Sequence, residues 1–181
     1  MKIVNRLQSS FVTLQVDDKN QRIVMESGVH FLEENNKSPF FEGINQNEEA
    51  ISIDGFKGKR LILFFYPKDS TPGCTLEVQN LRDNFLALKE MGYEVLGVSA
   101  DSVSRHKKFI EKHNLPFDLL ADEQKVIIND YGVWGEKKFM GKVYDGIHRT
   151  TFIINEEGVI ESIIKKVKTK EHAQQIFALT K

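Results

Sequence analysis

The stretch that decides the fold of this chain runs from Leu61 to Leu88 and reads LILFFYPKDSTPGCTLEVQNLRDNFLAL. Residues 61–66 form a continuous apolar run rich in β-forming residues, which predicts a buried strand. A short turn of Pro, Asp, Ser, Thr and Gly follows, and apolar residues at helical spacing then predict a single helix through Leu88. Cys74, the single cysteine of the sequence, falls where this helix begins.

The turn residues predict how the helix starts. Thr71 precedes a proline, which moves it out of the α region and suits an N-cap, so Pro72 becomes the first helical residue and Cys74 the third. The sulfur is then expected near the Thr71 hydroxyl and the unpaired N–H groups of the first turn, whose partial positive charge favours a thiolate. An unreactive buried cysteine behind an ordinary Thr-Pro cap fits the same residues, which leave both interpretations open.

The same stretch is similar to a known family. Pro67, Thr71 and Cys74 match the Pro-x-x-x-Thr-x-x-Cys motif of peroxiredoxins, and the run YPKDSTPGCTLEVQNLRD resembles their Q-type branch, the bacterioferritin comigratory proteins. The resemblance continues through VLGVSAD and YGVWGEKKFMGKVYDGIHRTTFIIN and covers about residues 38–181. It implies a thiol peroxidase in which the Cys74 thiolate attacks the O–O bond of a hydroperoxide and becomes a sulfenic acid.

The resemblance also assigns roles to individual residues. Pro67 would shield the pocket, Thr71 would hydrogen-bond the peroxide, and Arg149 would stabilise both the thiolate and the leaving oxygen. The expected substrate-binding residues are Thr71, Gly73, Cys74 and Arg149. Without the resemblance, Arg149 also fits an exposed strand position. Glu77 fits either an exposed helix position or a partner that orients Arg149.

The sequence departs from the family pattern at one position. Many Q-type relatives carry a resolving cysteine five positions after the first, where this chain has Gln79. The resemblance therefore implies a one-cysteine peroxiredoxin whose sulfenic acid is reduced by an external thiol, namely thioredoxin, glutaredoxin or glutathione. It implies a monomer rather than a dimer, with hydrogen peroxide or organic hydroperoxides as substrates. No cofactor is expected, and the five scattered histidines have no metal-ligand spacing.

The order of the remaining elements predicts an α/β, thioredoxin-like fold with a central mixed sheet flanked by helices. A strand at 93–98 and a helix capped by Asp101 follow the first helix, and a hairpin about residues 155–158 precedes a last helix capped by Thr169. Residues 131–146 are punctuated by glycine and predict a folded loop with one short strand. We expect this domain to cover residues 38–181. Residues 1–37 are expected to be a β-rich extension, a hairpin with its turn at residues 17–20 that covers a sheet edge or binds a partner.

The near-neutral charge of the chain bears on the classes of partner that it can bind. The 181 residues carry 25 basic and 26 acidic side chains, so no basic surplus favours nucleic acid or an acidic membrane. One cysteine fits a reducing compartment, and no run approaches membrane-spanning length, so a cytoplasmic protein is expected.

Two other functions compete with the peroxidase. A thioredoxin-like disulfide oxidoreductase uses two cysteines, and here Thr71 occupies the first position of its Cys-x-x-Cys motif. A redox sensor or protein-binding module switched by Cys74 oxidation uses the same site, and only multiple turnover separates it from a peroxidase.

Overall fold

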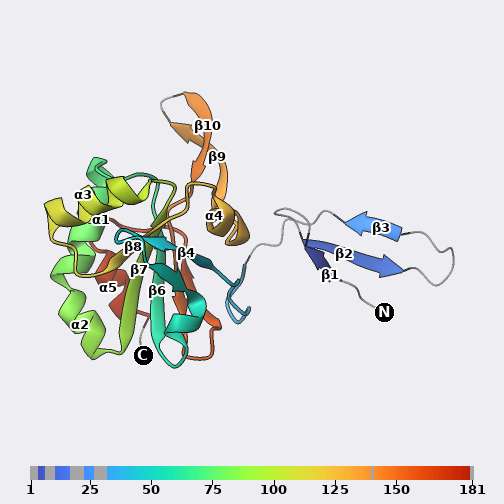
Figure 1. The fold of residues 1–181 in the computed structure, drawn as a ribbon, viewed down its shortest axis with the longest axis horizontal. Helices are drawn as coiled ribbons and strands as arrows, with labels where there is room; N and C mark the ends of the chain where they lie inside the picture. The colour runs from blue at the N-terminus through green and yellow to red at the C-terminus, as the bar shows by residue number, and fades with distance from the viewer. Residues whose placement is uncertain (1–3, 7–10, 17–22, 27–31, 140, 180–181) are drawn as a thin grey trace.

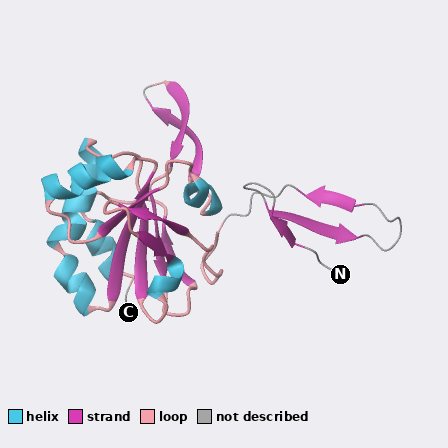
Figure 2. Cartoon of the chain, viewed as in Figure 1, coloured by secondary structure: helices cyan, strands magenta, loops and turns pink. Residues whose placement is uncertain are grey.

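A seven-stranded mixed sheet forms the centre of the computed structural model, which describes residues 4–6, 11–16, 23–26, 32–139 and 141–179 (Figures 1 and 2). Its strands are, in chain order, β4 (Glu42–Asn45), β5 (Ala50–Ser52), β6 (Arg60–Phe65), β7 (Tyr93–Ser99), β8 (Asp118–Ala121), β11 (Thr150–Ile154) and β12 (Ile160–Ile164). The helices are η1 (Ile53–Phe56), α1 (Pro72–Asp83), α2 (Phe85–Glu90), α3 (Val103–His113), α4 (Val126–Asp130) and α5 (His172–Phe177).

The strand order places β6 near the middle of the sheet, in the sequence β12-β11-β6-β7-β8-β4-β5. Strands β6, β7 and β8 are parallel, while β11 and β12 on one side and β4 and β5 on the other pair antiparallel. Helices α1 and α2 connect β6 to β7, and α3 connects β7 to β8, as expected for parallel crossovers. The predicted thioredoxin-like α/β arrangement is confirmed.

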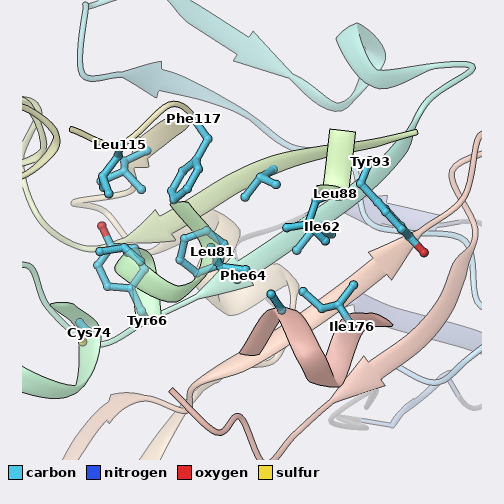
Figure 3. Close-up of a cluster of buried hydrophobic side chains, with 14 of the residues drawn as sticks. Ile62, Phe64, Tyr66, Cys74, Leu81, Leu88, Tyr93, Leu115, Phe117 and Ile176 are labelled. Carbon is cyan, nitrogen blue, oxygen red and sulfur yellow. The ribbon is translucent and has the colours of Figure 1, made fainter. Parts of the chain in front are cut away.

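Strand β6 divides the core because its alternate side chains point to opposite faces of the sheet. On one face Ile62, Phe64 and Tyr66 pack in a buried cluster with residues of α1, α2, α3 and α5, and Cys74 belongs to this cluster (Figure 3). On the other face Leu61, Leu63 and Phe65 pack with residues of α4 and β11. The helix that follows β6 is thus fixed against the sheet by the same strand that leads into it.

The helix predicted to run through Leu88 is interrupted at Asn84. This residue has φ −107° and ψ 8°, and its side-chain amide donates to the carbonyl of Asn80 at 2.8 Å. Such a local side-chain bond competes with the helical backbone pattern, which explains a break between α1 and α2 that periodicity did not predict.

Two paired strands occupy residues 134–139 and 142–147, whereas the sequence predicted a loop with one short strand. β9 (Trp134–Phe139) pairs antiparallel with β10 (Lys142–Ile147), and Gly141 in the connection has φ +79°. Gly141 is part of a hairpin connection and not of an irregular loop, because a residue with positive φ lets two strands fold back on each other. The hairpin projects from the rest of the domain (Figure 1).

Two helix starts also differ from the prediction. Ser102 rather than Asp101 is the N-cap of α3, and Glu171 rather than Thr169 is that of α5. The Asp101 carboxylate instead accepts hydrogen bonds from the Asp69 N–H and the Ser99 hydroxyl. Its other oxygen pairs with Arg105 Nε of α3 at 2.9 Å, so the side chain joins the turn to this helix without capping it.

The N-terminal strands form a second, three-stranded antiparallel sheet of β1 (Val4–Arg6), β2 (Phe11–Val16) and β3 (Ile23–Glu26). The predicted hairpin corresponds to β2 and β3, while its expected turn at residues 17–20 lies outside the described residues. The pairing of β1 with β2 was not predicted. No strand is shared between this sheet and the seven-stranded one among the described residues.

No helix in the described ranges has both the length and the apolar character needed to cross a membrane.

Candidate active site

The turn between β6 and α1 has the predicted start of a helix. Thr71 is the N-cap, with φ −83° and ψ 150°, and Pro72 is the first helical residue. The Thr71 hydroxyl, however, donates to the carbonyl of Lys68 at 3.0 Å and makes no hydrogen bond to the helix. The first-turn N–H groups, those of Gly73 and Cys74 among them, have no partner within the helix and are left for other acceptors.

Arg149 reaches the sulfur of Cys74 from the segment just before β11. Its Nη2 donates to Cys74 Sγ at 3.3 Å, and Cys74 is only 1% exposed. A Cβ placed on Gly73 would lie 3.5 Å from the same nitrogen, so the guanidinium lies across the first turn of α1. The structure therefore brings together Gly73, Cys74 and Arg149, while Pro67 lies half-buried at the start of the turn.

Glu77 holds the other side of the guanidinium. Its Oε2 accepts from Arg149 Nη1, and the carboxylate is fully buried, which resolves the two interpretations of this residue in favour of a partner for Arg149. Burial raises the pKa of Glu77 to about 7, against the opposing effect of the Arg149 charge. One guanidinium thus bridges the sulfur and a carboxylate one helical turn further along α1.

His172, at the start of α5, is a buried residue of this site that sequence reasoning missed. Its Nδ1 lies 3.3 Å from Glu77 Oε1, and its Nε2 lies 2.8 Å from Thr151 Oγ1. Burial, together with the Arg149 charge, lowers the pKa of His172 to about 3, so the ring is neutral at pH 7. The only sequence signal was a histidine at the start of an amphipathic helix, which does not indicate what it faces.

Lys137 brings a second cation toward the site from the β9–β10 hairpin. Its Nζ donates to the carbonyl of Ile147 at 2.9 Å. Burial and then the Arg149 charge lower the pKa of Lys137, while the charge of Cys74 acts in the opposite direction. Because the hairpin itself was not predicted, Lys137 could not be placed near the site from the sequence.

A buried polar network supports the turn from behind. The Asp69 carboxylate accepts from Tyr66 Oη at 2.7 Å and lies 2.8 Å from His106 Nδ1, and all three side chains are buried. Burial and the Asp69 charge raise the pKa of Tyr66 well above its usual value, so its hydroxyl keeps the proton that it donates. The other ring nitrogen of His106 faces the carbonyl of Leu120 at 3.3 Å. The segment between Pro67 and Thr71 is thereby tied to α3 and β8.

Gln79 and His148 both lie away from the Cys74 sulfur. Gln79 is half-buried on α1, and its Nε2 lies 3.4 Å from His113 Nδ1. His148 is exposed next to Gly135, as expected for a residue that alternates with Arg149 along the chain. No group of three or more metal-binding side chains occurs in the part of the chain that the structure describes.

Comparison with known proteins identifies the family. Residues 35–163 match the AhpC/TSA family model. The chain is 46% identical to the putative peroxiredoxin bcp of Haemophilus influenzae, covering 78% of this chain and 92% of that protein. It is 45% identical to peroxiredoxin Bcp of Escherichia coli, covering 75% and 86%.

Solved structures agree with this similarity. The bacterioferritin comigratory protein of Xanthomonas campestris superimposes with a TM-score of 0.72 at 33% identity, covering 76% of this chain and 88% of that one. The peroxidoxin BcpB of Mycobacterium tuberculosis gives a TM-score of 0.73 at 28% identity, covering 83% and 96%. Similarity of this extent spans the sheet, the turn and the helix that carries Cys74. The chain belongs to the AhpC/TSA family, as a peroxiredoxin of the Bcp type and hence a thiol peroxidase.

Proposed function

We propose that Cys74 is the residue that the peroxide substrate oxidises, and that hydrogen peroxide and organic hydroperoxides are the substrates. The observation that carries this proposal is the hydrogen bond from Arg149 to the Cys74 sulfur, with the same guanidinium anchored on buried Glu77. A charge-assisted bond of this kind stabilises a thiolate, the form of cysteine that attacks peroxides. The X. campestris relative is described as having alkyl peroxide reduction activity, which supports the organic substrates.

In the proposed reaction the Cys74 thiolate attacks one oxygen of the O–O bond. A new S–O bond forms, the O–O bond breaks, and the electron pair leaves with the other oxygen, which takes up a proton and departs as water or an alcohol. Cys74 is then a sulfenic acid. Arg149 and the free N–H groups of Gly73 and Cys74 stabilise the negative charge that moves onto the leaving oxygen. Thr71, at the start of the helix, would bind the peroxide. Pro67, at the start of the turn, would limit access of water.

An external thiol is proposed to complete the cycle because these 181 residues contain no second cysteine. The first thiol displaces hydroxide, which leaves as water, and forms a mixed disulfide with Cys74. A second thiol releases the Cys74 thiol and carries away the disulfide. Thioredoxin, glutaredoxin with glutathione, and glutathione alone are the candidate reductants, and all of them belong to a reducing compartment such as the cytoplasm.

Peroxide consumption by the purified protein tests this proposal. Wild type and Cys74→Ser are compared with hydrogen peroxide and cumene hydroperoxide, and each candidate reductant is supplied in turn. Multiple turnovers that require both Cys74 and one reductant support the proposal. A single fast oxidation of Cys74 that none of the reductants reverses would favour the redox sensor instead. If Cys74→Ser consumed peroxide at the wild-type rate, Cys74 would not be the reacting residue.

The domain boundary is also a proposal. We infer that the peroxidase unit includes residues 32–37 as well as residues 38–181. The Asn35 N–H donates to the carbonyl of Ile160 at 2.8 Å, and the Ile160 N–H donates to that of Asn36 at 2.9 Å, which supports including this segment. Removal of residues 1–31 is then expected to leave peroxide consumption unchanged, whereas removal of residues 1–37 lowers the unfolding temperature.

A further inference from the structure

We propose that His172 is a positioning residue of the peroxidase site, which donates a hydrogen bond from Nδ1 to Glu77 and so keeps this carboxylate charged and aimed at Arg149. The proposal rests on the function proposed above. It concerns a residue of α5, outside residues 35–163 that match the family model. His172 acts on the sulfur through Glu77 and Arg149 and not directly.

The geometry leaves Glu77 and His172 as partners for one another. Glu77 Oε1 and His172 Nδ1 are 3.3 Å apart, and both are buried atoms that have no other hydrogen-bond partner among the described residues. Buried polar atoms are nearly always paired in folded proteins, because an unpaired one loses its hydration without compensation. A small adjustment of either side chain completes this bond.

The neighbours of His172 determine which ring nitrogen carries the proton. The ring is fully buried and packs edge-on against Phe64, with 6.1 Å between ring centroids, which disfavours a charged imidazolium. A neutral ring has one N–H. An ionised Glu77 can only accept, whereas Thr151 Oγ1, at 2.8 Å from Nε2, can donate. Nδ1 therefore carries the hydrogen that points to Glu77, and Nε2 accepts from Thr151.

The protonation of Glu77 explains why this bond matters for the site. If Glu77 took up a proton, Arg149 would lose its charged partner and with it the force that holds the guanidinium beside the sulfur. Burial favours that neutral form of Glu77, and the Arg149 charge opposes it. A hydrogen bond from His172 adds to the effect of Arg149, because a bond donated to the charged form stabilises that form.

Few charged side chains lie near the Glu77 carboxylate. Arg149 faces Glu77 from the segment before β11, and Cys74 lies on the same helix. Lys137 on β9 interacts electrostatically with Arg149 and Cys74. This lysine is unchanged in every variant below, so it does not account for a difference between them. A difference in pH profile between a His172 variant and wild type is therefore read as an effect passed from Glu77 through Arg149 to the sulfur.

Two substitutions of similar polarity separate the proposed bond from simple packing. The side-chain nitrogen of asparagine takes the place of Nδ1, and that of glutamine takes the place of Nε2. His172→Asn therefore keeps a donor for Glu77, whereas His172→Gln keeps only the contact with Thr151. Ile176→Val is the matched control, since it trims the buried face of the same helix and leaves the polar contacts intact.

The experiment measures the second-order rate constant of Cys74 oxidation by hydrogen peroxide from pH 5 to 9. In His172→Gln we expect the acid limb to move up by about one pH unit, which is about tenfold in rate at a given pH on that limb. His172→Asn and Ile176→Val are expected to keep the wild-type profile. Equal profiles for His172→Asn and His172→Gln would overturn the proposal.

A parallel pH series with iodoacetamide keeps this test separate from the proposed function. Alkylation depends on the Cys74 thiolate and needs no peroxide. If the protein did not react with peroxide, the proposed function would fail, while the alkylation profiles of the same variants would still support or overturn the role of His172. The same shift in His172→Gln alone supports it, and identical alkylation profiles in both variants overturn it.

Discussion

Replacing Asp69 by alanine tests whether the buried network behind the turn stabilises the fold. The carboxylate accepts from Tyr66 Oη at 2.7 Å and lies 2.8 Å from His106 Nδ1, and both partners are fully buried. Without Asp69, His106 Nδ1 keeps only the long contact with Tyr66 Oη at 3.4 Å, and the Tyr66 hydroxyl keeps this contact and its hydrogen bond with Ser99. An unpaired buried polar group costs about 1–3 kcal/mol. We expect Asp69→Ala to lower the free energy of unfolding by about 3 kcal/mol, or the unfolding temperature by roughly 6–12 °C.

The matched control is Asp69→Asn, which keeps every buried group paired. Its amide oxygen accepts from Tyr66, and its amide nitrogen donates to His106 Nδ1. The other nitrogen of the His106 ring then donates to the carbonyl of Leu120, which lies 3.3 Å away. We expect this variant to lose about 1 kcal/mol or less, because only the charge of the acceptor is removed.

Urea and thermal unfolding at pH 7, followed by far-UV circular dichroism, measure both variants against wild type. The peroxide rate at 25 °C is measured in parallel, and it should fall in Asp69→Ala because the turn before Thr71 loses its attachment. Free energies of unfolding within about 0.5 kcal/mol of each other would contradict this prediction, since Asp69→Asn keeps the hydrogen-bond partners that Asp69→Ala removes.

Three further predictions follow from the site and the core. Arg149→Lys should lower the rate of Cys74 oxidation by about 100-fold, because lysine has one nitrogen and cannot bridge the sulfur and the carboxylate. A peroxide assay measures this rate, and a decrease of less than about threefold would contradict the prediction. Gly97→Ala should destabilise the fold by about 1–3 kcal/mol in urea unfolding, because the added Cβ would meet two buried side chains at 2.6 Å, whereas Gly55→Ala, with open space around it, should be neutral. The pKa of His172 is lowered to about 3 from 6.5 by burial and the Arg149 charge, so its contribution to stability is fully present above pH 6.5 and is lost as the pH falls toward 3. His172→Gln should therefore show a flatter decline of stability between pH 6.5 and 4, and an unchanged slope would count against this.

Some features of the fold were not predictable because they depend on side chains that compete with the backbone. Asn84 ends α1 through a bond to a carbonyl of its own helix, although the apolar spacing around it continues. The β9–β10 hairpin has a Gly141 turn but lacks a clear apolar alternation, so the same glycines fitted a loop. Asp101 resembled a helix cap and instead binds Asp69 across the turn.

The strand, the turn and the helix that present Cys74 were predictable from the order of the residues, because these elements depend on local signals. An apolar β-rich run, a Thr-Pro start and helical spacing act within a few residues of one another. The same local signals placed Cys74 in the first turn of α1, and the resemblance supplied Arg149 as its neighbour.

The charges that surround the sulfur depend on the packing of segments that are far apart in the chain. Arg149 meets Glu77 and Cys74 across separations of 72 and 75 residues, and His172 reaches Glu77 from the last helix. These contacts form because β11 pairs with β6 and α5 packs against α1, which places distant side chains in one buried space. In that space burial changes the proton affinity of Glu77 and His172, and this effect has no counterpart in the order of the residues.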